Sequence, residues 1–146
     1  MTTFNERVQQ MLRGEIPPPP IATTVGFQLT RAEAGLAVFV LEARPDRHAN
    51  PMGTLHGGVL CDIADAAMGT AYGTLLAEGE TFTTLELKIN FLKPVRTGRL
   101  VATGRLVKGG RTVGLLECDV VDDKDRLVAR ASSTCMTLRG EQAEGR

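Results

Sequence analysis

Residues 56–76 read HGGVLCDIADAAMGTAYGTLL, and this stretch decides the fold. Two glycines precede an apolar run whose hydrophobic residues recur at helical spacing around almost the whole circumference. A helix of that kind has to be enclosed by the rest of the chain. The stretch therefore predicts one long helix, from Gly57 to about Leu76, at the centre of the domain.

The segments on either side of this helix have the alternation that is typical of strands. Strands are predicted over residues 36–44, 83–93, 99–108, 111–121 and 127–138. In the second of these, the odd-numbered residues from Leu85 to Phe91 share one face, which we expect to be core. Gly109 and Gly110 predict a tight hairpin between the third and fourth. A long helix followed by at least four antiparallel strands predicts an α+β domain in which a sheet curls around the helix.

The N-terminal residues form a separate segment in this prediction. Residues 3–13 have the spacing of a short amphipathic helix, which Thr2 or Thr3 caps. Four prolines at 17–20 predict a stiff extended spacer after it. We divide the chain into this helix and spacer (1–20), one main domain (21–140) and a polar tail (141–146). The helix is expected to pack on the main domain or to cover a ligand pocket.

Composition excludes several classes of function. The 146 residues suffice for one core, and 17 basic residues balance 17 acidic ones, so no broad cationic face is expected for nucleic acid. Three scattered cysteines and two histidines give little support to a metal site. No secretory leader and no run of about 18 apolar residues is recognisable. We therefore expect a cytoplasmic protein without nucleic-acid, membrane or metal partners.

Two carboxylates, Asp62 and Asp65, interrupt the apolar helix. A buried and unpaired carboxylate costs several kcal/mol, so it needs a partner, a raised pKa or a place in a cleft. For Asp65 a structural role, either exposure to solvent or an ion pair with an arginine, and a functional role remain equally open. For Asp62 a structural role is favoured, because its side of the helix carries small residues.

The start of the helix is a second candidate site. Amides of the first turn have no acceptor within a helix, and glycines let a ligand approach them, as in an oxyanion hole. An ordinary turn into the helix is the alternative. Gly57 and Asp65 are separated by about 12 Å along the helix axis, too far for both to contact one carbonyl carbon. If both act on one substrate, they come from two subunits of a symmetric dimer.

The sequence NPMGTLHGG at 50–58, followed by Asp65 and by INFLKP at 89–94, resembles the hotdog-fold acyl-CoA thioesterases of the phenylacetate-degradation type. The likeness extends from about residue 25 to residue 138. It implies a five- or six-stranded antiparallel sheet around the long helix, and homodimers that pair into homotetramers. The implied reaction is hydrolysis of acyl-CoA to the free acid and CoA, with no cofactor because CoA is part of the substrate.

The resemblance also implies roles for individual residues. Those carried over as catalytic are Asp65, Gly57, His56, Asn50 and Thr84. Asp65 delivers a water or attacks directly, the Gly57 amide stabilises the oxyanion, and His56 orients the loop or the carbonyl. Asn50 and Thr84 position the water, although Thr83 is only one register step from Thr84.

Substrate-binding residues are predicted more broadly, as Gly58, Met68, Tyr72, Lys93 and Arg111. The acyl pocket is expected at Met52, Met68 and Tyr72, with plain core packing as the alternative. For the CoA phosphates Arg111 is the first choice, and the other candidates are Lys93, Arg96, Arg99 and Lys108.

Two rival functions fit the same fold. A noncatalytic acyl-CoA-binding module would need no acid at position 65. A dehydratase or hydratase would need a histidine that the helix lacks.

Overall fold

The computed structural model describes residues 1–146. Its elements follow the chain in the order α1 (Phe4–Leu12), α2 (Pro20–Val25), β1 (Phe27–Glu33), β2 (Leu36–Ala43), α3 (Pro45–His48), α4 (Gly57–Gly73), β3 (Thr81–Phe91), β4 (Gly98–Gly109), β5 (Val113–Val121), β6 (Leu127–Leu138) and a final 3-10 turn (Gly140–Ala143). The predicted N-terminal helix, long helix and five strands are therefore present.

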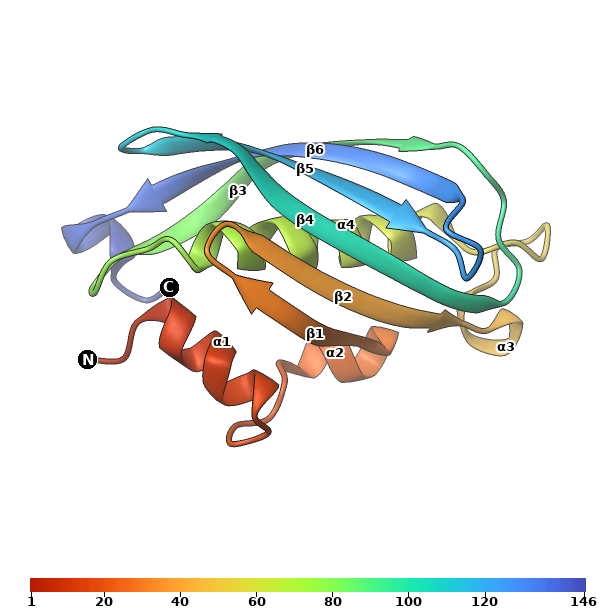
Figure 1. The fold of residues 1–146 in the computed structure, drawn as a ribbon, viewed down its shortest axis with the longest axis horizontal. Helices are drawn as coiled ribbons and strands as arrows, with labels where there is room; N and C mark the ends of the chain where they lie inside the picture. Colours follow the sequence, from red (N-terminus) through yellow and green to blue (C-terminus); the bar gives the residue numbers. More distant parts are fainter.

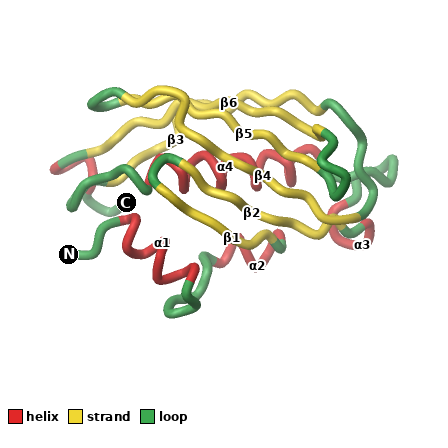
Figure 2. Tube along the Cα trace, viewed as in Figure 1, coloured by secondary structure: helices red, strands yellow, loops and turns green.

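The six strands form one antiparallel sheet in the order β1-β2-β4-β5-β6-β3. The sheet curls around α4, which runs along its concave side, while α1 and α2 lie beside the β1 edge (Figure 1). Figure 2 shows the same arrangement by type of element, with strands in one curved layer over the helix. This confirms the predicted hotdog fold, with six strands.

Packing of α4 on the sheet explains why the helix is so apolar. Ile63, Ala64, Ala67 and Ala71 are completely buried against the strands. The opposite side is not enclosed, however, because Gly58 and Asp65 are exposed and Ala66 is only half-buried. The expectation of a helix covered all round is wrong for this face, which the sheet leaves open.

The side-chain alternation observed in strand β3 differs from the predicted one. Thr84 pairs with Cys135 and Glu86 pairs with Thr134, so Leu85 is an extra residue in a β-bulge. The bulge shifts the side-chain phase by one, and Leu85 is 53% exposed instead of belonging to the core. The bulge also turns the Thr84 side chain towards α4. In a regular strand this side chain would lie on the more solvent-exposed face.

The N-terminal segment differs from the prediction in two elements. Thr3 caps α1 in a reciprocal arrangement with Glu6, as expected. Pro20 does not continue the spacer but begins α2, because a fixed proline φ suits the first position of a helix. Strand β1 was missed, since a bulge between Leu29 and Arg31 interrupts its alternation.

The β4–β5 connection is longer than a two-residue hairpin. Gly109 ends β4 and Val113 begins β5, and the Gly110 amide donates to the Val113 carbonyl at 2.8 Å. Neither Gly109 nor Gly110 has a positive φ. The primed turn that two adjacent glycines favour is therefore not used.

The β5–β6 turn is organised by one buried carboxylate, Asp122. It accepts hydrogen bonds from the amides of Lys124 and Arg126 and from the Arg126 side chain, and the Lys93 ammonium lies 3.1 Å away. Burial alone would raise the pKa of Asp122, but the hydrogen bonds from Arg126, Lys93 and Lys124 outweigh it and hold the pKa well below its usual value. The ionised form therefore stabilises the fold.

We expect Asp122→Asn to lower the free energy of unfolding near neutral pH and to matter less in acid. A depressed pKa contributes stability above the unfolded-state value, about 4, which is lost as the pH falls through the folded-state value. Urea unfolding of both proteins at about pH 7 and about pH 3 measures this. A difference that stays constant between the two pH values would contradict the assigned role.

Candidate active site

Asp65 lies on the open face of α4, where Thr84 reaches it from β3. The Thr84 hydroxyl donates to Asp65 Oδ1 at 3.2 Å. Thr84 and not Thr83 makes this contact, because the bulge at Leu85 sets the phase of the strand. Two of the predicted catalytic residues are thus in contact.

A cysteine behind Thr84 extends this hydrogen-bond chain. Cys135 Sγ lies 3.7 Å from Thr84 Oγ1. Burial raises the pKa of the Cys135 thiol, with a further contribution from Asp65, so the thiol keeps its proton at neutral pH. When Thr84 gives its single hydrogen to Asp65, the Cys135 thiol is the group that donates to Thr84.

Asp62 is one helical turn before Asp65 and is half-buried. Burial raises the pKa of the Asp62 carboxyl, and the neighbouring charge of Asp65 raises it further. No arginine or lysine forms an ion pair with either carboxylate. Of the two structural alternatives that the sequence left open, the ion pair is absent within the chain, whereas the Asp65 side chain is exposed, as the other alternative expects.

Both carboxylates line a cavity of about 480 Å³ between α4 and the N-terminal segment. Its other walls are the apolar face of α1, the prolines at 17–19, α2 and the inner faces of β1 and β2. The N-terminal helix therefore docks on the main domain, as expected, and also lines a cavity.

The N-terminus of α4 presents one unused amide. His56 is the N-cap, and its Nδ1 accepts the Gly58 amide at 2.9 Å. The Gly57 amide has no acceptor within the chain, and the tip of the Phe91 ring lies close to its Cα. Gly57 is thus free to bind a ligand oxygen, whereas the predicted Gly58 amide is already occupied.

A rigid loop holds this helix end. Asn50 Oδ1 accepts the amides of Met52 and Thr54, and its Nδ2 donates to the Thr54 hydroxyl at 2.8 Å. The buried His48 fixes the loop from behind, since its Nδ1 accepts the Arg44 amide and its Nε2 donates to the Val25 carbonyl. Asn50 therefore organises the approach to Gly57 and keeps one amide hydrogen for a ligand.

Asn50 and Gly57 line a second hollow, of about 370 Å³, together with Phe91 and Lys93. Asp65 does not line it, and Gly57 does not line the larger cavity. The structure therefore groups the predicted catalytic residues into two half-sites on one helix, Asp65 with Thr84 and Gly57 with His56 and Asn50.

The residues predicted for the acyl pocket do not lie at either cavity. Met68 is fully buried beneath the sheet, where the Ser133 hydroxyl contacts its sulfur, and the Tyr72 hydroxyl lies 2.7 Å from Thr137 Oγ1. Met52 is 72% exposed. None of these residues lines either cavity, so the core alternative holds for Met68 and Tyr72.

Lys93 and Arg111, two of the basic residues predicted to bind CoA phosphates, lie apart. Lys93 is beside Gly57 but is paired with Asp122. Arg111 is in the β4–β5 connection, at the other end of the long strand β4, and lines neither cavity.

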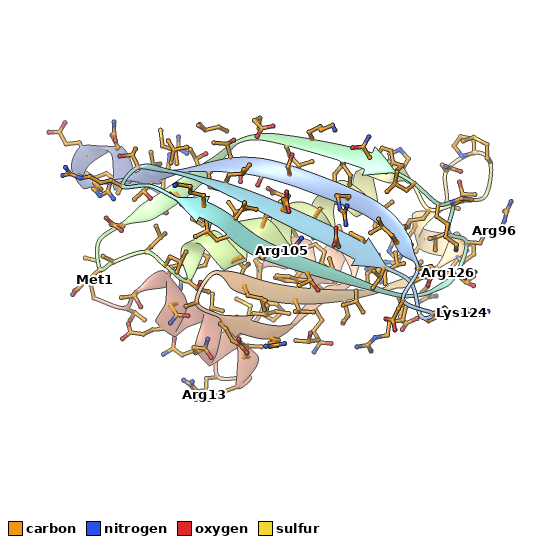
Figure 3. All side chains as sticks on the ribbon, turned by 45° about the horizontal axis from the view of Figure 1, so that its top comes forward. Met1, Arg13, Arg96, Arg105, Lys124 and Arg126 are labelled. Carbon is orange, nitrogen blue, oxygen red and sulfur yellow. The ribbon has the colours of Figure 1, made fainter.

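Other basic residues lie near the start of α4. Figure 3 shows Arg96, Lys124 and Arg126 together at the end of the molecule opposite Met1. Arg96 Nη1 donates to the carbonyl of Gly53 in the loop before α4. Cations therefore gather near the Gly57 half-site, and Arg111 is not among them.

Two further features of the structure bear on partners. No group of three histidine, cysteine, aspartate or glutamate side chains is placed to hold a metal ion. No helix is both long and apolar enough to cross a bilayer.

Comparison with known proteins identifies the family. The sequence profile of the thioesterase superfamily matches residues 52–129, which are more than half of the chain. A 1,4-dihydroxy-2-naphthoyl-CoA hydrolase of Listeria monocytogenes is 28% identical over 111 residues, which cover 76% of this chain and 89% of that protein. A medium/long-chain acyl-CoA thioesterase of Escherichia coli is 27% identical over 131 residues, which cover 80% and 84%.

The solved structures lead to the same family. That of a phenylacetic acid degradation-related protein from Ralstonia eutropha has a TM-score of 0.80 and 32% sequence identity, and the match covers 92% of this chain and 99% of that one. Sequence, fold and the residues at the helix agree, and the chain therefore belongs to the thioesterase superfamily as a hotdog-fold thioesterase.

Proposed function

We propose that this thioesterase hydrolyses acyl-CoA to the free acid and CoA, with Asp65 as the carboxylate that activates water. The observation that carries the proposal is the Asp65–Thr84 contact at the wall of an apolar cavity. An acid held beside a place for an apolar acyl group is what hydrolysis of such a thioester requires.

The proposed active site needs two copies of the chain. Gly57 and Asp65 are about 12 Å apart along α4, and each belongs to a different hollow. Strand β3 has one unpaired edge and carries the exposed Leu85 and Phe91, whereas Gln9 of α1 donates to the Ala32 carbonyl on β1 at 3.3 Å. A symmetric homodimer through the β3 edge places one copy's Gly57 near the other's Asp65 and makes two equivalent sites. Pairing of two dimers gives the homotetramer expected from the resemblance.

In this site the thioester carbonyl accepts a hydrogen bond from the Gly57 amide. The helix N-terminus stabilises the oxyanion that forms when water attacks, an effect of about 3 kcal/mol for one good donor. Asp65 takes the proton of that water while Thr84 holds the carboxylate in place. A thiol is a much stronger acid than an alcohol, so CoA leaves as a thiolate without a strong general acid.

The direct test is release of CoA thiol from a broad panel of acyl-CoA esters by the purified protein. We expect turnover of at least one class of acyl group, and size-exclusion chromatography with light scattering is expected to give a dimer or a tetramer. A pre-steady-state burst of one thiol per site would indicate that Asp65 attacks the carbonyl itself. Binding without turnover anywhere in the panel would favour the noncatalytic acyl-CoA-binding module.

A further inference from the structure

The cavity beside Asp65 is not formed by the sheet and α4 alone. Residues from 4 to 22 supply one whole wall, and the opposite wall is the open face of α4 with the inner sides of β1 and β2. Helix α1 turns Phe4, Val8 and Met11, at the i, i+4, i+7 spacing of one helical face, towards the main domain.

Two contacts fix the position of that wall. Val8 is 3% exposed, so α1 is docked and not loosely attached. The Phe4 ring lies edge-on to Phe82 of β3 and fills the space where a side chain on Gly73 of α4 would be. The N-terminal segment is therefore packed at a set distance from Asp65.

The dimensions of this wall match an extended hydrocarbon tail. Phe4 and Met11 are seven residues apart, about 10 Å along α1 at 1.5 Å per residue. A fully extended chain advances roughly 1.2 Å per bond, so this length takes a tail of about eight to ten carbons. A cavity of about 480 Å³ lies within the usual range for small-molecule sites.

The composition of the lining also favours a tail over a polar or small acyl group. The charged lining residues are Arg7 on α1 and the two carboxylates on α4, and most of the remaining lining is aliphatic, aromatic or proline. A tail that enters at Asp65 leaves its thioester beside the carboxylate and its methyl end among apolar side chains. An acetyl group would leave nearly all of this surface uncovered.

We propose that residues 4–22 form the distal wall of the acyl site, and that this wall selects straight-chain acyl-CoA esters of medium length. The inference rests on the proposed acyl-CoA hydrolysis. It adds the class of acyl group and the residues that limit the length of the acyl chain. Met11, which is half-buried at the cavity wall, is the residue that limits tail length.

The test is the chain-length profile of kcat/KM from acetyl- to hexadecanoyl-CoA, with phenylacetyl-CoA included. For the wild type we expect a rise of about fourfold per added methylene up to octanoyl- or decanoyl-CoA and no further rise beyond. Met11→Trp fills the cavity and is expected to reduce kcat/KM for decanoyl-CoA at least tenfold while changing that for butanoyl-CoA less than twofold. Met11→Ala enlarges the cavity and is expected to move the optimum to longer chains. This second variant keeps the proposal testable if Met11→Trp does not fold.

Gln10→Trp is the matched control, because Gln10 lies on the outer face of the same helix. It is expected to leave the profile unchanged, with thermal unfolding measured for every variant. A flat wild-type profile, a preference for phenylacetyl-CoA, or identical profiles for folded Met11 variants and wild type would overturn the inference and leave the proposed function standing.

Failure of the proposed function has a different signature. If the wild type hydrolyses no ester, calorimetric titration with decanoate still tests the cavity. Binding by the wild type and Gln10→Trp, with at least tenfold weaker binding by Met11→Trp, would support the wall. Equal affinities or no binding would overturn it.

Discussion

Replacing Asp65 with asparagine is expected to lower kcat for acyl-CoA hydrolysis by about a thousandfold, within the range for loss of a general base. Asparagine has nearly the same shape, and its Oδ1 still accepts the Thr84 hydroxyl, so only the negative charge and the basicity are removed. Asp65 is exposed in the chain and has no ion-pair partner. The free energy of unfolding should therefore change by no more than about 0.5 kcal/mol.

Steady-state thiol release at saturating acyl-CoA measures this effect, with urea unfolding as the check on folding. Asp62→Asn is the matched control, since it makes the same change one turn earlier on the wall of the same cavity. Burial and the charge of Asp65 raise the pKa of Asp62, so its ionised form is unfavourable in the folded chain. We expect Asp62→Asn to be as stable as wild type or slightly more so, and to lose less than about tenfold in kcat.

The two carboxylate variants together decide the chemistry. Full activity in Asp65→Asn would exclude the mechanism proposed above. A severe loss in Asp62→Asn with little effect in Asp65→Asn would assign the catalytic charge to the other carboxylate. A severe loss in both would mean that the two acids act as a coupled pair.

The sequence could predict the arrangement around α4 because periodicity reports burial directly. The apolar run after Gly57 and strand β2 follow a regular pattern. Strands β4 and β6 each contain one bulge, but at 12 residues each they keep a long regular stretch. The elements that the sequence missed are short ones in which regularity fails. Strand β1 contains a bulge at Thr30, its fourth residue, and α2 begins with the last of four prolines.

The sequence could name candidate residues for the site, but it could not give their geometry. Asp65 and Gly57 stand out as a charge in an apolar helix and a glycine at a helix start. Only the resemblance to the family suggested Thr84. Regular alternation would point this side chain away from Asp65, and the bulge at Leu85 turns it towards Asp65. Met68 and Tyr72 were misplaced because helical spacing identifies a face and does not say what covers it; here the sheet does.

Gly104 explains how the sheet can approach α4 closely enough to bury it. A Cβ built on Gly104 would lie 2.4 Å from the Ala67 carbonyl carbon and 2.6 Å from the Met68 nitrogen, both of them backbone atoms of α4. Backbone cannot rotate away as a side chain can. A methyl group at this position therefore has to push β4 and α4 apart along part of their contact.

We expect Gly104→Ala to lower the free energy of unfolding by about 3 kcal/mol, at the upper end for overpacking of a core. Gly109→Ala on the same strand is the control, because a Cβ there meets only the flexible Leu106 side chain at 3.2 Å. It should stay within about 1 kcal/mol of wild type in urea unfolding. Equal midpoints for both variants would mean that β4 and α4 can separate without loss of packing.

The same substitution links packing to the reaction. Gly104 touches α4 at Ala67, two residues after Asp65, so a displaced helix carries the carboxylate away from Thr84 on β3. Gly104→Ala should therefore reduce kcat even at temperatures where the protein stays folded, and Gly109→Ala should not. A Gly104→Ala protein that is destabilised yet fully active would show that the position of Asp65 relative to β3 does not limit the rate.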